Sequence, residues 1–354
     1  MTKFNYLCRD AAVKRMNELG HMHRPFFFLI DFDEKMCIVE EPDNLSESIL
    51  LFDFPNASSA GLDIEEENYR NSRKGLNPTI CTGKKSVCQD GIVWETSPQS
   101  FMEYSKSFDI VIRNIYAGNS FLTNLTCETP LHTNLSLEDI FFNSKAKYRL
   151  WLKDKFIMFS PEIFVRIENG MIFSHPIKGT IDADIPDAET KILNDVKESA
   201  EHATITDLIR NDLSRIADEV TVTRYRYTDR LDTHKGPLLQ VSSEIRGRLP
   251  EDYCSSLGSL FFQLLPAGSI TGAPKKKTVE IIREAETYDR GFYTGVTGYF
   301  DGKNLDSAVI IRYVELKPDG SLSFKSGGGI TFMSDARSEY DEMIRKVYVP
   351  LSPL

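Results

Sequence analysis

The chain has 354 residues, of which 41% are hydrophobic and 27% are charged, so it is long enough to bury a substantial core. Its 52 acidic and 42 basic side chains give a formal net charge of -10, which disfavours a nucleic-acid-binding surface. No stretch approaches the roughly 18 apolar residues that a membrane-spanning helix needs. We therefore expect a cytoplasmic protein that binds neither nucleic acid nor membrane.

The cysteines are scattered along the chain, without a CxxC pair or the Cys and His clustering of zinc sites. Reduced thiols are expected at all of these positions: Cys8, Cys37, Cys81, Cys88, Cys127 and Cys254.

The first third of the chain predicts a helix followed by strands. An amphipathic pattern indicates a helix from about Asp10 to Leu19, and the runs PFFFLIDF, KMCIVEE and ILLFDF indicate three strands. The polar segment from Leu62 to Glu95 predicts an irregular connection. Apolar residues at helical spacing then predict a helix from Phe101 to Ile115, with Gly118 at its C-terminal end.

The rest of the chain predicts hairpins with helices between them. SFLTNLTCETPL predicts a strand, and WLKDKFIMFSPEIFVRIENGMIFSHPI predicts several strands with a tight turn at Asn169-Gly170. A long helix is expected from about Pro186 to Ile216 and a shorter one from Lys277 to Glu286.

Three further elements are predicted near the end of the chain. FYTGVTGYFDGKNLDSAVIIRYVEL predicts a hairpin that turns at Asp301-Gly302, SLSFKSGGGI a strand, and Asp335 to Tyr348 a helix. This order of elements predicts an α+β fold with largely antiparallel sheets. No Pro/Gly/Ser linker separates two autonomous units, so we expect a single domain over residues 1–354.

Two of the expected helices carry paired glutamates. Glu198 and Glu201, and likewise Glu339 and Glu342, are three residues apart, which places each pair on one helical face. Oxygen ligands of this kind suit Mg²⁺, which takes one or two carboxylates and keeps several waters. The same spacing is also common on solvated helix faces, so the pairs alone leave both interpretations open.

Three other features are suited to binding anions. Gly327, Gly328 and Gly329 leave backbone amides that an anion can approach closely, although glycine triplets are also ordinary turns. Arg312 closes the strand SAVIIR, where its guanidinium could clamp a carboxylate or form a surface ion pair. The segment PAGSITGAPKKKT places Gly268, Ser269, Thr271, Gly272 and Lys275 just before a helix, whose N-terminal amides favour anions.

Lys178 lies in HPIKGT, directly after an expected strand. A lysine at such a position is usually an exposed side chain. A nucleophilic lysine must instead lose its proton, which burial or a nearby cation promotes by lowering the amine pKa.

Taken together, seven separated segments resemble the chorismate-utilising enzymes, which include anthranilate synthase large subunits, aminodeoxychorismate synthase component I, and isochorismate and salicylate synthases. The resemblance covers about residues 101–350, and residues 1–100 match less clearly. The segments occur in the family order: SPE, PIKGT, KESAEHATITDLIRND, AGSITGAPK, DSAVIIR, SGGGI and EYDE.

The resemblance implies a two-lobed β-sandwich flanked by helices, with one deep site for chorismate and Mg²⁺. Glu201 and Glu342 would contact the metal directly, and Glu198 and Glu339 would support it through water. Glu162 would be the general acid that protonates the departing 4-hydroxyl. The remaining implied residues would bind the substrate: Arg312 and Tyr293 on the enolpyruvyl carboxylate, and Gly179, Thr180, Thr271, Lys275, Gly328 and Gly329 around the anion pocket.

Within this family, the lysine before Gly-Thr marks the aminodeoxychorismate synthases. The resemblance therefore implies that Lys178 attacks C2, the 4-hydroxyl leaves, and ammonia then displaces the lysine by attack at C4. The product would be 4-amino-4-deoxychorismate, the precursor of p-aminobenzoate and folate. Anthranilate synthase and isochorismate or salicylate synthase are the alternatives within the family, and a non-catalytic chorismate- or glutaminase-binding subunit is the alternative outside enzymes.

Two further expectations concern partners and a departure from the family pattern. The chain contains no recognisable glutaminase or lyase segment, so ammonia is expected from a separate glutamine amidotransferase subunit, and a separate aminodeoxychorismate lyase is expected downstream. Gln240 stands where many relatives carry a histidine close to the enolpyruvyl arm. This departure fits either an enzyme that stops before pyruvate elimination or a weakened site.

Overall fold

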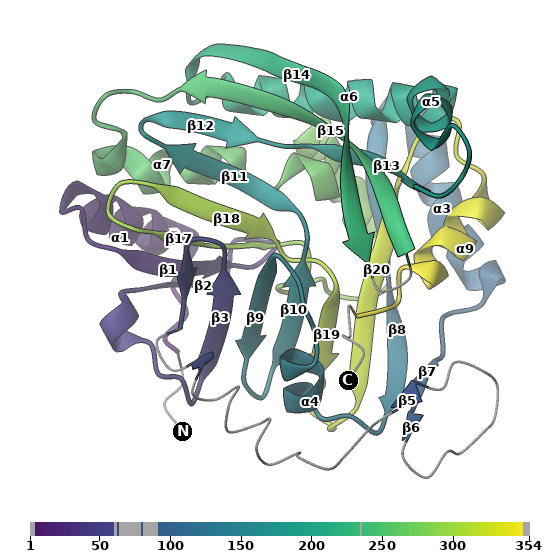
Figure 1. Cartoon of the computed structure of the whole chain (residues 1–354), viewed down its shortest axis with the longest axis horizontal. Coiled ribbons are helices and arrows are strands. Elements are labelled where there is room, and N and C mark those ends of the chain that lie inside the picture. The colour runs from purple at the N-terminus through teal and green to yellow at the C-terminus, as the bar shows by residue number, and fades with distance from the viewer. Residues whose placement is uncertain (1–3, 60–61, 64–78, 81–90, 234–235, 350–354) are drawn as a thin grey trace.

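The structure is a computed structural model that describes residues 4–59, 62–63, 79–80, 91–233 and 236–349. Two large sheets dominate the described residues, and all strand pairs within them are antiparallel (Figure 1). The predicted α+β fold with antiparallel sheets is therefore confirmed. The polar connection expected over residues 62–95 lies largely outside the described residues.

The first sheet carries strands from the start, the middle and the end of the chain. Its order is β13 (Ile177–Asp182), β15 (Gly236–Arg248), β12 (Met171–Ser174), β11 (Ile163–Glu168), β18 (Leu305–Val309), β17 (Val296–Phe300), β1 (Phe26–Ile30) and β2 (Cys37–Glu40), with β14 (Asp218–Thr233) also paired to β15.

The second sheet is built in the same way. Its order is β16 (Gly272–Ala273), β8 (Leu122–Thr133), β20 (Leu322–Ile330), β19 (Tyr313–Leu316), β10 (Phe156–Ser160), β9 (Tyr148–Leu152), β3 (Leu50–Phe54) and β4 (Ala57–Ser58), with β7 (Trp94–Thr96) also paired to β8. A separate parallel pair joins β5 (Thr79–Ile80) and β6 (Gly91–Ile92).

Helices cover the outer faces of both sheets (Figure 1). Within the described residues, none is long and apolar enough to cross a membrane. The α-helices are α1 (Arg9–His21), α3 (Phe101–Tyr116), α4 (Leu137–Phe142), α5 (Ala188–Asn194), α6 (Val196–Leu213), α7 (Leu257–Phe261), α8 (Lys275–Ala285) and α9 (Ala336–Arg345). The short 3₁₀ helices are η1 (Pro42–Asn44), η2 (Tyr253–Ser256), η3 (Phe262–Leu264) and η4 (Gly268–Ile270).

The position of β1 explains why its sequence is a continuous apolar run instead of an alternation of apolar and polar residues. Phe26, Phe28 and Ile30 belong to the core cluster that includes residues of α1 and α7. Phe27 and Leu29 point to the opposite face and join the cluster that includes residues of β3, β9 and β10. Both faces of β1 are therefore buried, one under helices and the other between the two sheets.

The single long helix expected from Pro186 to Ile216 was wrong. The structure has two helices, α5 and α6, with Asp195 in an extended conformation between them. The Asp195 side chain accepts a hydrogen bond from the Glu198 amide at 2.8 Å and so caps the start of α6. An aspartate at this position satisfies a helix N-terminus better than it continues a helix.

The hairpin expected around Asp301-Gly302 is confirmed for β17 and β18, but β19 pairs in the other sheet. The chain changes sheets between Val309 and Tyr313, and Arg312 adopts a φ of 53° in this connection. Arg312 therefore follows β18 instead of closing a strand. A positive φ at a non-glycine residue costs about 1 to 3 kcal/mol and persists only where the surrounding contacts hold it.

The long hairpin of β14 and β15 had no counterpart among the predicted elements. Charged residues interrupt β14 in the run TRYRYTDR, so its sequence lacks a clean alternation of apolar and polar residues. The register of the pair also shifts several times. The hairpin positions β13, because β13 pairs with β15 at the edge of the sheet.

Candidate active site

A cavity of about 460 Å³ lies among β13, α6, β20 and α9, within the size range of small-molecule sites. The predicted site residues come from distant parts of the sequence, and most of them meet here. Those that line the cavity are Glu162, Lys178, Gly179, Thr180, Glu198, Glu201, Tyr293, Arg312, Gly328, Gly329, Glu339 and Glu342.

The four glutamates lie on two capped helices. Asp195 caps α6, and the side chain of Asp335 caps α9 by accepting a hydrogen bond from the Ser338 amide at 2.9 Å. Glu198 and Glu339 lie in the first turns of these helices, where the helix dipole stabilises negative charge. Glu339 is only 4% exposed. The two pairs therefore face the cavity, although the Glu342 side chain remains 41% exposed.

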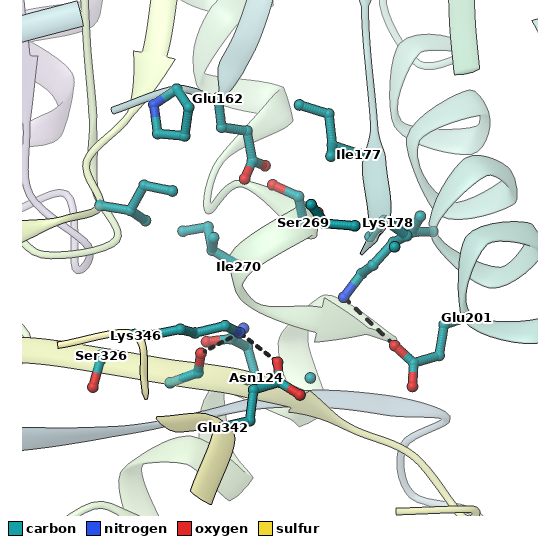
Figure 2. A pocket seen from close by; sticks show the side chains of 18 of the residues that line it. Asn124, Glu162, Ile177, Lys178, Glu201, Ser269, Ile270, Ser326, Glu342 and Lys346 are labelled. Carbon is teal, nitrogen blue, oxygen red and sulfur yellow. Dashed lines mark hydrogen bonds and ion pairs between the residues drawn. The ribbon is translucent and has the colours of Figure 1, made fainter. Parts of the chain in front are cut away.

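Lysine side chains are paired with these carboxylates. Lys178 Nζ lies 3.8 Å from Glu201 Oε2, and Lys197 Nζ lies 3.2 Å from Glu339 Oε1 and 3.8 Å from Glu201 Oε1. Lys346 Nζ lies 2.7 Å from Glu342 Oε1. Figure 2 shows Lys178 and Lys346 reaching into the same space from opposite sides.

Lys178 is the least constrained of the lysines that line the cavity in the described part of the chain. Lys346 donates to the Gly327 carbonyl at 3.0 Å in addition to its pair with Glu342. Lys325 donates to two carbonyls and lies 3.1 Å from Glu315. The single ion pair of Lys178 is long by comparison, so this amine can reorient towards a bound molecule at the lowest cost.

The acidic groups differ in their readiness to ionise. Burial raises the pKa of Glu198 and of Glu201, and the Lys178 ammonium partly offsets this effect in both. Burial also favours a raised pKa for Glu342, but Lys346 outweighs it, with Lys178 and Lys197 contributing, so that the pKa falls below its usual value. Among Glu198, Glu201 and Glu342, the last therefore ionises most readily.

The donor set fits a hard cation without being preassembled around one. All four carboxylates line the cavity and offer the oxygen ligands that hard cations prefer. Among the described residues, however, no three His, Cys, Asp or Glu side chains come together as a metal site. Such a set suits Mg²⁺, which can take two carboxylates and complete its coordination with water and oxygens of a bound molecule.

The glycine triplet forms an open edge beside these charges. Gly327, Gly328 and Gly329 pair with β8 on one side, whereas the register with β19 ends at Lys325. A Cβ added at Gly328 would lie 3.4 Å from Glu339 Oε2, and one at Gly329 would lie 3.3 Å from Lys178 Nζ. The triplet therefore lies near the end of β20, and its missing side chains make room for a ligand.

Gly179 is needed for a different reason. It lies in β13 next to Lys178 and has a φ of 86°, which glycine adopts without strain. A Cβ there would also lie 3.2 Å from Glu198 Oε2. The local chain direction at Lys178 thus depends on a residue without a side chain.

Glu162 and Ser269 lie together on another wall of the cavity (Figure 2). Burial raises the pKa of Glu162, and a hydrogen bond with Ser269 and the charge of Lys178 oppose the shift. A carboxyl group with a raised pKa remains protonated at higher pH than usual and can act as a proton donor.

Tyr293 and Arg312 complete the side of the cavity near the crossover between the sheets. Tyr293 is 4% exposed, and burial raises the pKa of its phenol, so the hydroxyl remains a hydrogen-bond donor. The Arg312 guanidinium lies over the Tyr348 ring, 4.7 Å from its centroid, and also lines the cavity. Both groups can donate to a carboxylate.

Two predicted binding residues do not reach this cavity. Thr271 has no exposed surface and is absent from the lining, although its carbonyl accepts a hydrogen bond from the amide of Asn124, which does line it. Lys275 is also absent from the lining and pairs with Asp212 at 2.7 Å. The buried aspartate neutralises Lys275, so the prediction that it binds an anion in this pocket is corrected.

Several lining residues were not predicted from the sequence. Lys197 and Lys346 carry a usable signal, because each is four residues from a predicted metal ligand on the same helical face. Other lining residues have no local signal, since they reach the cavity only through strand pairing and turns. They are Asn124, Ile270, Thr294, Lys325 and Ser326, whereas Ser269 belongs to the segment that was predicted to bind anions. Gln240, identified as a departure from the family pattern, also lines the cavity.

Comparisons with known proteins agree with the resemblance seen in the sequence. The family model described as chorismate binding enzyme matches residues 4–352. An uncharacterised PabA-like protein from Haemophilus influenzae is 44% identical over 339 residues, covering 96% of each chain. A probable chloroplastic aminodeoxychorismate synthase from rice is 31% identical over 297 residues, covering 79% of this chain and 32% of the rice protein.

A solved structure supports the same family. Anthranilate synthase component I from Streptococcus pneumoniae matches with a TM-score of 0.64 and 26% identity, covering 90% of this chain and 70% of that one. The family model spans nearly the whole chain, and the cavity gathers residues from the family segments. The chain therefore belongs to the chorismate-binding enzyme family, whose members act on chorismate.

Proposed function

We propose that the protein aminates chorismate at C4 and forms 4-amino-4-deoxychorismate. The observation that carries this proposal is the position of Lys178, which lines the cavity and has only a 3.8 Å ion pair to Glu201. The other lysines of the lining are held by shorter contacts. The partial likeness to the probable aminodeoxychorismate synthase from rice also favours this reaction.

The proposed reaction has two displacement steps. The Lys178 ammonium first releases a proton to solvent, and the resulting amine forms a bond to C2, the two ring double bonds shift, and the C4–O bond breaks. Glu162 donates a proton, so the oxygen leaves as water. Ammonia then forms a bond to C4, the double bonds shift back, and the C2–N bond to Lys178 breaks. A proton from the new amine returns to Glu162, and the sum is chorismate plus ammonia giving 4-amino-4-deoxychorismate plus water.

Binding of chorismate is assigned to the polar walls of the cavity. Arg312 and Tyr293 would hold the enolpyruvyl carboxylate, because both present donors from the crossover side. Gly328 and Gly329 leave the space for the substrate, and Gly179 and Thr180 would contribute from β13. Charged and polar groups on all sides fit a dianionic ligand.

The space that the glycine triplet leaves open can be tested by adding a methyl group to it. Gly329→Ala adds a methyl group 3.0 Å from Leu122 Cδ1 and 3.3 Å from Lys178 Nζ, so the lysine must move. We expect turnover of chorismate to fall by about 10-fold or more, since small misplacements of a reacting group cost this much. The control is Gly320→Ala in the β19–β20 turn, where φ is 85° and no atom lies within 4 Å. Gly320→Ala should lower the free energy of unfolding by about 1 to 2 kcal/mol without affecting turnover. Equal turnover by the two alanine variants would contradict the role assigned to Gly329.

Mg²⁺ is proposed as the cofactor, with Glu201 and Glu342 as direct ligands and Glu198 and Glu339 bonded through water. When bound, the ion supplies the positive charge that holds the ring carboxylate. Glu201→Gln keeps the size of the ligand but removes its charge. We expect the Mg²⁺ concentration for half-maximal activity to rise by about 10-fold or more, because even the loss of a group that only supports a metal ligand lowers metal affinity by about 10- to 100-fold. An unchanged Mg²⁺ titration would remove Glu201 from the ligand set.

The nitrogen donor is proposed to be ammonia released by a separate glutamine amidotransferase subunit. The product would then pass to an aminodeoxychorismate lyase, in p-aminobenzoate and folate synthesis. We expect the purified chain to use ammonium salts directly and to be inactive with glutamine alone. Turnover of glutamine by the purified chain would contradict the proposal that a separate subunit releases the ammonia.

The product distinguishes the proposed function from its alternatives. Purified protein would be incubated with chorismate, Mg²⁺ and ammonium, and the products separated before and after addition of a lyase. The proposal expects 4-amino-4-deoxychorismate and then p-aminobenzoate. Anthranilate alone would indicate the anthranilate synthase reaction, and ammonia-independent turnover would indicate isochorismate or salicylate formation. Chorismate binding without turnover would indicate a non-catalytic subunit.

A further inference from the structure

A buried ion pair lies directly behind one wall of the cavity. It joins Glu286, which ends α8, to Arg290 four residues later, and both side chains are 2% exposed. Arg290 Nε donates to Glu286 Oε2 at 2.8 Å, and Nη2 donates to Oε1 at 2.6 Å. The bidentate geometry fixes the plane of the guanidinium.

The remaining guanidinium protons bind three other segments of the chain. Nη2 donates to the carbonyl of Asn124 at 2.7 Å, and Nη1 donates to the carbonyl of Ile270 at 3.1 Å and to Thr294 Oγ1 at 3.2 Å. An arginine side chain has five N–H groups, and every one of them has an acceptor here. A lysine offers three protons from a single nitrogen and cannot make the same set of bonds.

These acceptors all belong to residues that line the cavity, whereas Arg290 itself does not. Asn124 lies in β8, Ile270 in η4, and Thr294 in the connection that precedes β17. Figure 2 shows Asn124 and Ile270 in the close view of the pocket. One guanidinium thus connects three cavity segments that are far apart in the sequence.

Thr294 depends on this support more than the other two. It is β-branched and has a φ of 63°, a conformation that costs about 1 to 3 kcal/mol in isolation. Its hydroxyl donates to the Tyr293 carbonyl at 2.6 Å while accepting from Arg290. The peptide that carries the Tyr293 side chain is therefore held in place through Thr294 and Arg290.

The carboxylate of Glu286 extends the same network to β8. It accepts hydrogen bonds from the amide of Thr126 at 2.8 Å and from its hydroxyl at 2.7 Å. Thr126 is two residues from Asn124 and pairs with Gly327 of the glycine edge. The ion pair consequently fixes β8 at two points, Asn124 and Thr126.

We propose that Arg290 is a positioning residue that sets the affinity for chorismate by fixing the wall made by Asn124, Ile270 and the Tyr293–Thr294 peptide. It acts through that wall and does not touch the substrate. The inference rests on the proposed binding of chorismate in this cavity, but it does not depend on amination at C4 or on Lys178. It also assigns a function to a buried charge pair that stability alone does not require, because apolar residues of similar size often stabilise a core equally well.

Arg290→Lys tests this role while keeping the positive charge beside Glu286. We expect the KM for chorismate to rise about 10-fold or more, because at least two of the five hydrogen bonds are lost and the wall can shift. The kcat at saturating chorismate should fall less than about threefold, because a wall that affects substrate binding leaves Lys178 and Glu162 in place. Direct titration with chorismate in the absence of ammonia should show the same loss of affinity.

Arg149→Lys is the matched control. Arg149 donates through Nε and Nη2 to Asp53 Oδ2 at 3.0 and 2.7 Å, and it is not part of the cavity lining. This variant should lose stability while the KM for chorismate is unchanged. A KM increase of the same size in both variants, or a folded Arg290→Lys protein with wild-type KM, would overturn the proposal.

Thr294→Val keeps the test decisive if Arg290→Lys does not fold. The substitution removes one acceptor of Arg290 and preserves the shape of the side chain. We expect the KM to rise several-fold with little change in kcat, and Thr294→Ser, which keeps the hydroxyl, should restore the wild-type KM. Equal KM values for the valine and serine variants would overturn the proposal. If the wild-type protein does not bind chorismate, the proposed function fails, and this inference fails with it.

Discussion

Lys178→Ala is expected to lower the rate of amination by at least about 10³-fold, because the variant lacks the nucleophile whose attack at C2 expels the 4-hydroxyl. The affinity for chorismate should change far less, since Lys178 has only one long ion pair and the other charged groups of the cavity remain. Steady-state kinetics with ammonium, together with a binding titration, would measure the two effects separately.

Lys178→Arg separates the chemical role of the lysine from its charge. Arginine keeps the positive charge beside Glu201, but it stays protonated and cannot attack carbon. We therefore expect the arginine variant to be as inactive as the alanine variant. Substantial amination by either protein would exclude Lys178 as the nucleophile and leave it an electrostatic role.

Glu162→Gln is expected to lower kcat by about 10² to 10⁴-fold, the range over which general acids contribute. Glutamine has a similar shape and can still accept a hydrogen bond from Ser269, but it has no acidic proton. Chorismate binding should be nearly unchanged. The measurement is kcat at saturating chorismate and ammonium, compared with Ser160→Ala as a neighbouring variant that leaves the carboxyl group intact.

The pH dependence gives a second test of Glu162. A general acid must be protonated, so activity through Glu162 should fall as the pH rises through its raised pKa. The Glu162→Gln variant should lose this decline on the alkaline side. A decline of the same form in the variant would assign the titration to another group.

Much of the fold follows from local sequence patterns. The apolar run of β1 and the turn at Asp301-Gly302 each indicated the correct element, because strand burial and turn chemistry act over a few residues. The break at Asp195 was missed because the residues on both sides of it are compatible with a helix, whereas Asp195 is extended and its side chain caps the start of α6.

In the candidate site, too, features set by nearby residues could be predicted, and features set by contacts between distant segments could not. The glutamate pairs could be predicted because helical spacing places them on one face, and the structure brings both faces to one cavity. Lys275 was misplaced because its partner, Asp212, lies 63 residues away in the sequence and no pattern near Lys275 indicates it. The pairing of Arg290 with Asn124 and Ile270 likewise depends on how distant segments pack.

The lysine ammonium groups of the cavity compete with a cation for the glutamate carboxylates. Each predicted metal carboxylate except Glu198 lies within ion-pair distance of a lysine in the structure. Binding of the proposed Mg²⁺ would therefore displace an ammonium group wherever the two compete for the same oxygen. Such a displacement is least costly for Lys178, whose pair is long. The same property that allows Lys178 to leave Glu201 allows it to approach a substrate carbon.

The most direct test of the central claim is the intact mass of the protein after incubation with chorismate and Mg²⁺ in the absence of ammonia, followed by peptide mapping. Lys178 should carry an adduct of chorismate minus one water, and the adduct should disappear when ammonium is added, with release of 4-amino-4-deoxychorismate. Ammonia-dependent amination without any adduct on Lys178, or with an adduct on another residue, would contradict the account.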